Sequence, residues 1–307
     1  MMPLDADFLR GSYPPLVTPF LNGKVDFQKF AELAKRQAEE GSHGVVVSGT
    51  TGEPSSLTVR ERADLVKASV EALAGRIPVV AATGSQSYDE TVELTEQAEK
   101  AGANALLVVT PYYIKPSQNG LVEYFVAIGR RTELPLLIYH IPGRAAVSVT
   151  AATVERIAAQ LPNLVGIKHA ANDLELVTEL LAQVGSDFRV FCGLESLSLP
   201  MLTIGAAGLM NAVGNLAPSR VAALYQAVKQ GNLTQARQLH FELFELNQSI
   251  FVDTNPVPLK YMMARLGLLD SPELRLPLVP LDQDRAKMLD QVLVRAGLLQ
   301  PAASTAI

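Results

Sequence analysis

The stretch LPLLIYHIPGRAAVSVTAATVERIAAQLPNLVGIK, residues 134–168, contains the pattern that decides the fold. It begins with an apolar run at Leu134–Tyr139, continues through an amphipathic stretch at Thr150–Gln160, and ends with a second apolar run at Leu164–Lys168. Both runs are almost continuously apolar, as strands are when both faces of a parallel sheet are covered. The stretch therefore predicts one strand–helix–strand unit.

The same alternation extends in both directions from this stretch. Further apolar runs lie at Tyr13–Phe20, Gly44–Ser48, Ile77–Ala82, Ala105–Val109, Phe188–Cys192 and Gly208–Val213. Segments with helical periodicity separate all eight runs. An unbroken series of eight strand–helix units predicts an α/β protein whose parallel strands close into a (β/α)8 TIM barrel. A doubly wound open sheet is the alternative that the same pattern allows.

The strand pattern stops near Ala217. Helical patterns then fill Ser219–Gly231, Leu233–Phe251, Pro258–Leu266 and Asp282–Ala296. We therefore predict two parts: residues 1–216 form the barrel that carries the active site, and residues 217–307 form a C-terminal helical extension packed on it. Residues 300–307 are small and polar, so we expect them to be frayed.

Composition and charge exclude several classes of partner. The chain has 307 residues, a formal net charge of −5 and no dense run of Lys or Arg, which argues against nucleic acid and anionic membranes. The single cysteine, Cys192, excludes an internal disulfide and fits a reducing compartment. The N-terminus lacks the apolar run of a signal peptide, and no apolar stretch is long enough to span a membrane. We therefore expect a cytoplasmic protein.

Lys168 stands in an unusual place for a charged residue. Catalytic residues of barrel enzymes lie at the C-terminal ends of the strands, and Lys168 ends the run LVGIK. An ammonium group inside an apolar barrel is costly unless it is paired or neutral. Burial favours the neutral amine, which attacks a ketone to form a Schiff base. Position alone also allows a surface lysine just past the end of a strand.

Two other predicted strand ends carry polar side chains. Tyr139 ends the run next to that of Lys168, and its phenol can shuttle protons, although a tyrosine at the edge of the core fits equally. Thr50 and Thr51 lie in a turn, where they can bind a carboxylate and relay protons or cap a helix. Arg144 lies in a Pro-Gly loop, where its guanidinium suits a substrate carboxylate or a surface salt bridge.

Other chemistries lack support in the sequence. The four histidines show no metal-ligand spacing, and the predicted strand ends carry no cluster of Asp or Glu. There is no phosphate-binding glycine motif of either common type. We therefore expect neither a metal ion nor a nucleotide at the site.

Five motifs occur in order over nearly the whole chain. They are GTTGEPSSLT at 49–58, TPYYIKPSQNGL at 110–121, YHIPGR at 139–144, GIKHA at 166–170 and NPVPLK at 255–260. In this order the chain resembles the dihydrodipicolinate synthase / N-acetylneuraminate lyase family of class I aldolases. The resemblance implies a Schiff base between Lys168 and pyruvate, with Tyr139 as the proton-transfer group. It also implies that Thr51 links Tyr139 to Tyr113 of a neighbouring subunit.

The resemblance extends to the binding groups. It implies that Thr50 helps to hold the pyruvate carboxylate, that Arg144 binds the carboxylate of the second substrate, and that Gly193 and Met210 contact substrate. The partners implied are pyruvate and a small aldehyde that carries a carboxylate. Members of the family need no cofactor or metal, and they are typically tetramers built as a dimer of dimers.

The branch within the family is harder to assign. The motifs most resemble the synthase branch, which condenses pyruvate with aspartate semialdehyde. However, His140, Ala145 and His169 depart from YNVPGRT and GIKEA, the forms usual in that branch. We interpret these departures as a changed rim of the site, which points to a changed aldehyde. The alternatives are a catabolic aldolase acting on 2,4-dihydroxyhept-2-ene-1,7-dioate, a neuraminate lyase-like enzyme, and a non-catalytic barrel that binds a 2-oxo acid.

Overall fold

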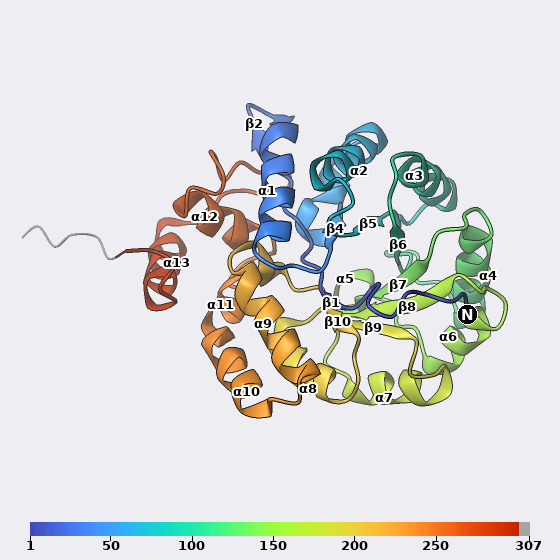
Figure 1. The fold of residues 1–307 in the computed structure, drawn as a ribbon. Helices are drawn as coiled ribbons and strands as arrows, with labels where there is room; N and C mark the ends of the chain where they lie inside the picture. Colours follow the sequence, from blue (N-terminus) through green and yellow to red (C-terminus); the bar gives the residue numbers. More distant parts are fainter. Residues whose placement is uncertain (301–307) are drawn as a thin grey trace, which may run out of the picture.

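A computed structural model describes residues 1–300, so the fraying predicted for the C-terminus lies outside the described residues from 301 on. Eight parallel strands form one sheet in the order β1-β10-β9-β8-β7-β6-β5-β4 (Figure 1). Their bounds are β1 Gly11–Ser12, β4 Val45–Val47, β5 Val79–Ala82, β6 Ala105–Val109, β7 Leu136–His140, β8 Leu164–His169, β9 Arg189–Cys192 and β10 Gly208–Leu209. A parallel bridge between Pro15 and Val46 joins the two ends of this order. The predicted barrel is therefore confirmed, and the open sheet is excluded.

The first strand is shorter than its apolar run. The run Tyr13–Phe20 was predicted as a strand, but regular pairing is confined to Gly11–Ser12, followed by the bridge at Pro15. Pro14, Pro15 and Pro19 lack a backbone N–H group and cannot donate to a ladder. A short antiparallel hairpin, β2 Phe20–Leu21 with β3 Lys24–Val25, follows outside the ring.

Helices cover the outside of the ring. They are α1 Phe27–Glu39, α2 Val59–Leu73, α3 Tyr88–Lys100, α4 Gln118–Gly129, α6 Ala151–Ala158, α7 Leu174–Gln183, α8 Ser198–Thr203 and α9 Pro218–Lys229. The starts of most are set by capping side chains, which accept a hydrogen bond from the first turn: Asp26, Thr58, Ser87, Ser117, Thr150 and Asp173. Each such cap stabilises its helix by about 1 kcal/mol. The helical stretches predicted at Thr150–Gln160 and Ser219–Gly231 end within two residues of α6 and α9.

The C-terminal helices are α10 Leu233–Glu242, α11 Phe244–Ser249, α12 Val257–Arg265 and α13 Gln283–Arg295. The single helix predicted for 233–251 is thus two helices that meet at Leu243. Helix α9 packs directly against β1 and β10, like the other helices of the barrel. Helices α10 to α13 follow it and lie together at one side of the barrel in Figure 1. The helical layer of the barrel therefore continues past residue 216, and the division into two parts at that point stays a prediction. Within the described residues, no helix combines the length and apolarity needed to cross a bilayer.

Buried side chains separate into an inner and an outer layer. Along β7, Leu137 and Tyr139 belong to the cluster that fills the barrel, while Leu136 and Ile138 pack outward against the helices. This alternation is the period of two that a strand imposes. Each strand can therefore present a polar side chain to the mouth of the barrel from its last inward position.

Candidate active site

One irregularity in β8 determines which way its last side chains point. Along β7, Leu136 pairs with Leu164, but the next residue, Leu137, pairs with Gly166. Val165 therefore has no partner of its own in β7. An extra residue of this kind in one of two paired strands is a β-bulge. A shift of one residue exchanges the two faces of a strand, so every side chain after the bulge turns to the opposite face.

The bulge turns Lys168 into the barrel. Val165 belongs to the inner cluster, so in a regular strand the third residue after it would point outward. Beyond the bulge Ile167 packs in the outer layer instead, and Lys168 faces inward. The Lys168 side chain is buried, and its Nζ lies 4.3 Å from the centroid of the Tyr139 ring. A surface position for Lys168 is thereby excluded.

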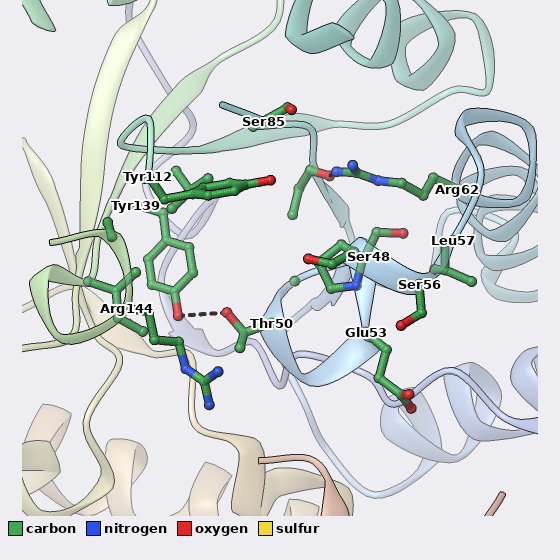
Figure 2. A pocket seen from close by; sticks show the side chains of 18 of the residues that line it. Ser48, Thr50, Glu53, Ser56, Leu57, Arg62, Ser85, Tyr112, Tyr139 and Arg144 are labelled. Atoms are coloured by element: carbon green, nitrogen blue, oxygen red, sulfur yellow. Dashed lines mark hydrogen bonds between the residues drawn. The ribbon is translucent and has the colours of Figure 1, made fainter. Parts of the chain in front are cut away.

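Tyr139 connects this lysine to the loop after β4. Tyr139 and Lys168 are partners in the register of β7 and β8, so their side chains lie side by side. The Tyr139 hydroxyl is 3.2 Å from Oγ1 of Thr50, close enough for a hydrogen bond in which either group donates (Figure 2). Tyr139 is therefore in direct contact with both the amine of Lys168 and a hydroxyl at the mouth of the barrel.

The two threonines differ from the predicted arrangement. Thr51 was expected to contact Tyr139, but Thr50 makes that contact. Both residues lie in the 3-10 helix Thr50–Gly52, in which successive side chains point in different directions. The Thr51 hydroxyl instead accepts a hydrogen bond of 2.9 Å from Nδ2 of Asn255 in the C-terminal region. Asn255 stands in the motif NPVPLK, but the sequence did not indicate its contact with Thr51.

Gly193 and Met210 contribute space and packing. A Cβ atom at Gly193 would lie 2.7 Å from Cε of Lys168, closer than such atoms approach one another. Any larger residue at this position would displace the lysine chain. Met210 is buried in the inner cluster with Tyr139 and Phe191. Gly193 is thus placed beside Lys168, and Met210 lies in the apolar floor of the barrel mouth.

A cavity of about 410 Å³ opens at this mouth. Its walls include Thr50, Tyr112, Tyr139 and Arg144. Lys168 does not line the cavity itself, but it contacts the ring of Tyr139, which does. The volume lies in the range usual for sites that bind small molecules.

Arg144 lies at one side of this cavity in a short helix, α5 Pro142–Ala145, rather than in the predicted loop. Its Nη2 donates to Oγ1 of Thr254 and to the backbone carbonyl of Asn255, each at 3.4 Å. Both partners are uncharged oxygens, so these contacts leave its positive charge uncompensated. The predicted role of Arg144 as a carboxylate ligand suits this position.

Arg62 lies on the other side of the cavity (Figure 2). It is buried, it donates to the carbonyl of Ala82 at 2.7 Å, and burial lowers its pKa to about 10. The nearby carboxylate of Glu90 opposes this lowering of the pKa, but Glu90 itself accepts a hydrogen bond from Ser85. The cavity therefore has a guanidinium at each side, which favours anionic ligands.

Tyr113 does not reach the cavity of its own chain. Its side chain is 84% exposed, and its backbone is in the left-handed region with a φ of 73°. That conformation is strained for a residue with a large side chain. The neighbouring Tyr112 lines the cavity instead. A contact between Tyr113 and this type of site therefore requires a second copy of the chain.

His140 and His169 do not lie on the rim, contrary to the interpretation of their sequence positions. Both are buried on the outer side of β7 and β8, and neither lines the cavity. Their Nδ1 atoms are 3.0 Å apart, so the N–H of one ring donates a hydrogen bond to the nitrogen of the other. Burial, and then the neighbouring His169, lower the pKa of His140 to about 4. These two departures therefore cross-link neighbouring strands and leave the substrate face unchanged.

The pair predicts a loss of stability in mild acid. The pKa of His140 lies below its value of about 6.5 in an unfolded chain, so the unfolded state binds more protons between these two values. The free energy of unfolding should therefore fall by about 2 kcal/mol between pH 7 and pH 5. Urea unfolding at the two pH values measures this change. The His140→Asn/His169→Gln variant should show a much smaller change, and an equal loss in both proteins would contradict the assignment.

No three His, Cys, Asp or Glu side chains within residues 1–300 lie close enough together to hold a metal ion. The site offers the chemistry of an inward lysine beside a tyrosine, under a cavity with a guanidinium group at each side. This combination on a (β/α)8 barrel defines an aldolase-type lyase.

Comparisons with known proteins identify the family. The profile of the Dihydrodipicolinate synthetase family matches residues 8–296, and the chain therefore belongs to this family, as the resemblance of its motifs predicts. The chain is 46% identical over 291 residues to the 4-hydroxy-tetrahydrodipicolinate synthase of Thermus thermophilus, covering 94% of this chain and 97% of the relative. The enzyme of the same name from Nitratidesulfovibrio vulgaris is 40% identical over 289 residues, covering 94% and 99%.

Solved structures agree with this assignment. A dihydrodipicolinate synthase from Thermotoga maritima superimposes with a TM-score of 0.92 at 40% identity, covering 94% of this chain and 99% of that one. The dihydrodipicolinate synthase from Aquifex aeolicus gives a TM-score of 0.93 at 35% identity, covering 95% and 100%. The chain is thus an enzyme of the lyase class with the fold of these relatives.

Proposed function

We propose that the chain condenses pyruvate with aspartate semialdehyde, the activity of a 4-hydroxy-tetrahydrodipicolinate synthase. The observation that carries the proposal is the contact of Tyr139 with both Lys168 and Thr50 at the floor of a cavity flanked by cations. The names of relatives that are 46% and 40% identical over nearly their whole length support the same activity.

The reaction follows from the chemistry of an amine beside a phenol. Nζ of Lys168 forms a bond to C2 of pyruvate, and the carbonyl oxygen leaves as water to give an imine. Loss of a proton from C3 gives an enamine, whose carbon attacks the aldehyde carbon of the second substrate. The amino group of that substrate then attacks the imine carbon and releases Lys168. Tyr139 carries the protons of these steps, with Thr50 as its hydrogen-bonded partner.

The remaining predicted roles are part of the same proposal. Arg144 binds the carboxylate of the aldehyde, and Gly193 and Met210 shape the floor beneath pyruvate. Tyr113 enters the site of a partner subunit in a homotetramer of the cytoplasm. Its high exposure and strained backbone support this role, because a residue is held in such a conformation only where the surroundings or the function require it.

Steady-state assays with pyruvate and one of three aldehydes test the proposal. The value of kcat/KM should be highest with aspartate semialdehyde and at least about tenfold lower with succinate semialdehyde, because a site built to bind an amino group is left with an unpaired polar group. It should be lowest with N-acetylmannosamine, which lacks a carboxylate for Arg144. A preference for either of the other aldehydes would contradict the proposal. Analytical ultracentrifugation of the same enzyme should show a tetramer, and a fully active monomer would contradict the role of Tyr113.

A further inference from the structure

The segment 254–260 of the C-terminal region touches the mouth of the barrel at three places. Asn255 donates to Thr51, and Arg144 donates to Thr254 and to the carbonyl of Asn255. Lys260 forms a buried ion pair of 2.7 Å with Glu53, three residues after Thr50. The adjacent residues Thr254 and Asn255 therefore contact both Thr51, in the loop beside Lys168, and Arg144, the proposed ligand of the aldehyde's carboxylate.

The direction of the Asn255–Thr51 hydrogen bond has a chemical consequence. The Asn255 amide nitrogen donates and the Thr51 hydroxyl accepts, at 2.9 Å between buried groups. A hydroxyl has one hydrogen of its own, and accepting a bond does not use it. The hydrogen of Thr51 therefore stays available for a further acceptor. Thr50 differs in its partner, because its hydroxyl shares a hydrogen bond with the Tyr139 phenol, in which either group donates.

The available acceptor follows from the position of the loop. Thr51 is adjacent to Thr50, which contacts the tyrosine that lies against Lys168. A 2-oxo acid bonded to Nζ of Lys168 carries its carboxylate one bond from the reacting carbon. A hydroxyl whose hydrogen is not otherwise used is the type of donor that this carboxylate requires.

We propose that Asn255 is a positioning residue that acts through Thr51 on the carboxylate of the 2-oxo acid, while Thr254 acts through Arg144 on the second substrate. The inference rests on the proposed function and adds the assignment of one side chain to each substrate. Because these residues are neighbours, the C-terminal region sets the geometry of both halves of the site from one short segment.

The matched variants Asn255→Ala and Thr254→Ala separate the two roles. We expect Asn255→Ala to raise KM for pyruvate about tenfold, the effect of losing one oriented hydrogen bond, with kcat changed less than about threefold. KM for the aldehyde should stay within about twofold, because the backbone carbonyl to Arg144 remains. Thr254→Ala should show the reverse, with a rise of about threefold in KM for the aldehyde only. Equal effects of both variants on both KM values would overturn the proposal.

A double-mutant cycle tests whether Asn255 acts through Thr51. In a Thr51→Val background, Asn255→Ala should add almost nothing to KM for pyruvate, since the group it positions is already gone. Additive effects would overturn the inference. If Asn255→Ala fails to fold, the isosteric Asn255→Asp variant serves in its place, because a carboxylate accepts the Thr51 hydrogen and should raise KM for pyruvate at least as much.

Borohydride reduction in the presence of pyruvate keeps this test apart from that of the proposed function. Wild-type enzyme that traps pyruvate on Lys168 supports the proposed reaction whatever the Asn255 variants do. The pyruvate concentration for half-maximal trapping should rise about tenfold in Asn255→Ala, in parallel with KM. An unchanged half-saturation together with normal wild-type trapping would reject the role of Asn255 and leave the reaction intact.

Discussion

Replacement of Lys168 by alanine is expected to lower kcat by at least about 10³-fold and to abolish the covalent adduct with pyruvate. The inward position of Lys168 beside Tyr139 makes it the amine that can reach a ligand at the barrel mouth. Without this amine there is no imine, and the carbanion at C3 of pyruvate loses its electron sink. Mass spectrometry after borohydride reduction measures the adduct, which adds pyruvic acid less one oxygen atom to the chain.

A matched control uses a lysine of the surface. Lys67 lies on α2 with 66% of its side chain exposed, and Lys67→Ala should keep both the adduct and kcat. An adduct that persists in Lys168→Ala, or one that maps to another lysine in the wild-type enzyme, would refute the assignment of the Schiff base.

Replacement of Lys260 by methionine is expected to lower the free energy of unfolding by about 3–5 kcal/mol. The ion pair of Lys260 with Glu53 is completely buried, with 2.7 Å between Nζ and Oε1. Burial raises the pKa of Glu53 and lowers that of Lys260, while the charge of each partner opposes the shift. Removal of the amine leaves a buried carboxylate without its counter-charge. Urea unfolding at a fixed protomer concentration measures the loss.

The double variant Glu53→Gln/Lys260→Met separates the cost of an unpaired charge from the loss of the side chain. It should recover a large part of the stability, because removing both charges of a buried pair costs far less than removing one. The single variant should also be relatively more stable at pH 5 than at pH 7, since a protonated Glu53 no longer carries a buried charge. A single variant as stable as the wild type would show that the pair contributes nothing.

The strand pattern was sufficient to predict the barrel. Continuous apolar runs and helical periodicity mark both kinds of element, and they place Lys168 and Tyr139 at neighbouring strand ends. The inward direction of Lys168 depends on the bulge at Val165, which the apolar run LVGIK does not reveal. The packing of α9 was not evident from the sequence: this helix follows the predicted boundary at residue 216, which stays a prediction, and it packs on β1 and β10. No local feature of a helix shows whether it packs on the barrel or beside it.

Contacts across long sequence distances could not be predicted from the motifs. The sequence does not distinguish which of two adjacent threonines points toward Tyr139. The 3-10 helix directs Thr50 rather than Thr51 to it. Asn255 is 204 residues from Thr51, so no spacing rule connects them. His140 and His169 were interpreted as part of the rim because they depart from the motifs usual in the synthase branch, but the alternation of a strand places their side chains on the other face. The catabolic alternative depended on that interpretation, which the two histidines no longer support; Ala145 is the one of the three departures that lines the cavity.

The extra residue in β8 gives this strand an unusual tolerance of changes in length. Loss of Val165 would leave Leu164 opposite Leu136 and Gly166 opposite Leu137, which is regular pairing. Lys168 would still pair with Tyr139 and would still face the barrel. In a strand without a bulge, the loss of one residue instead turns every later side chain to the opposite face. Among relatives, a barrel that has lost this one residue but keeps the motif around the lysine would therefore keep its inward amine.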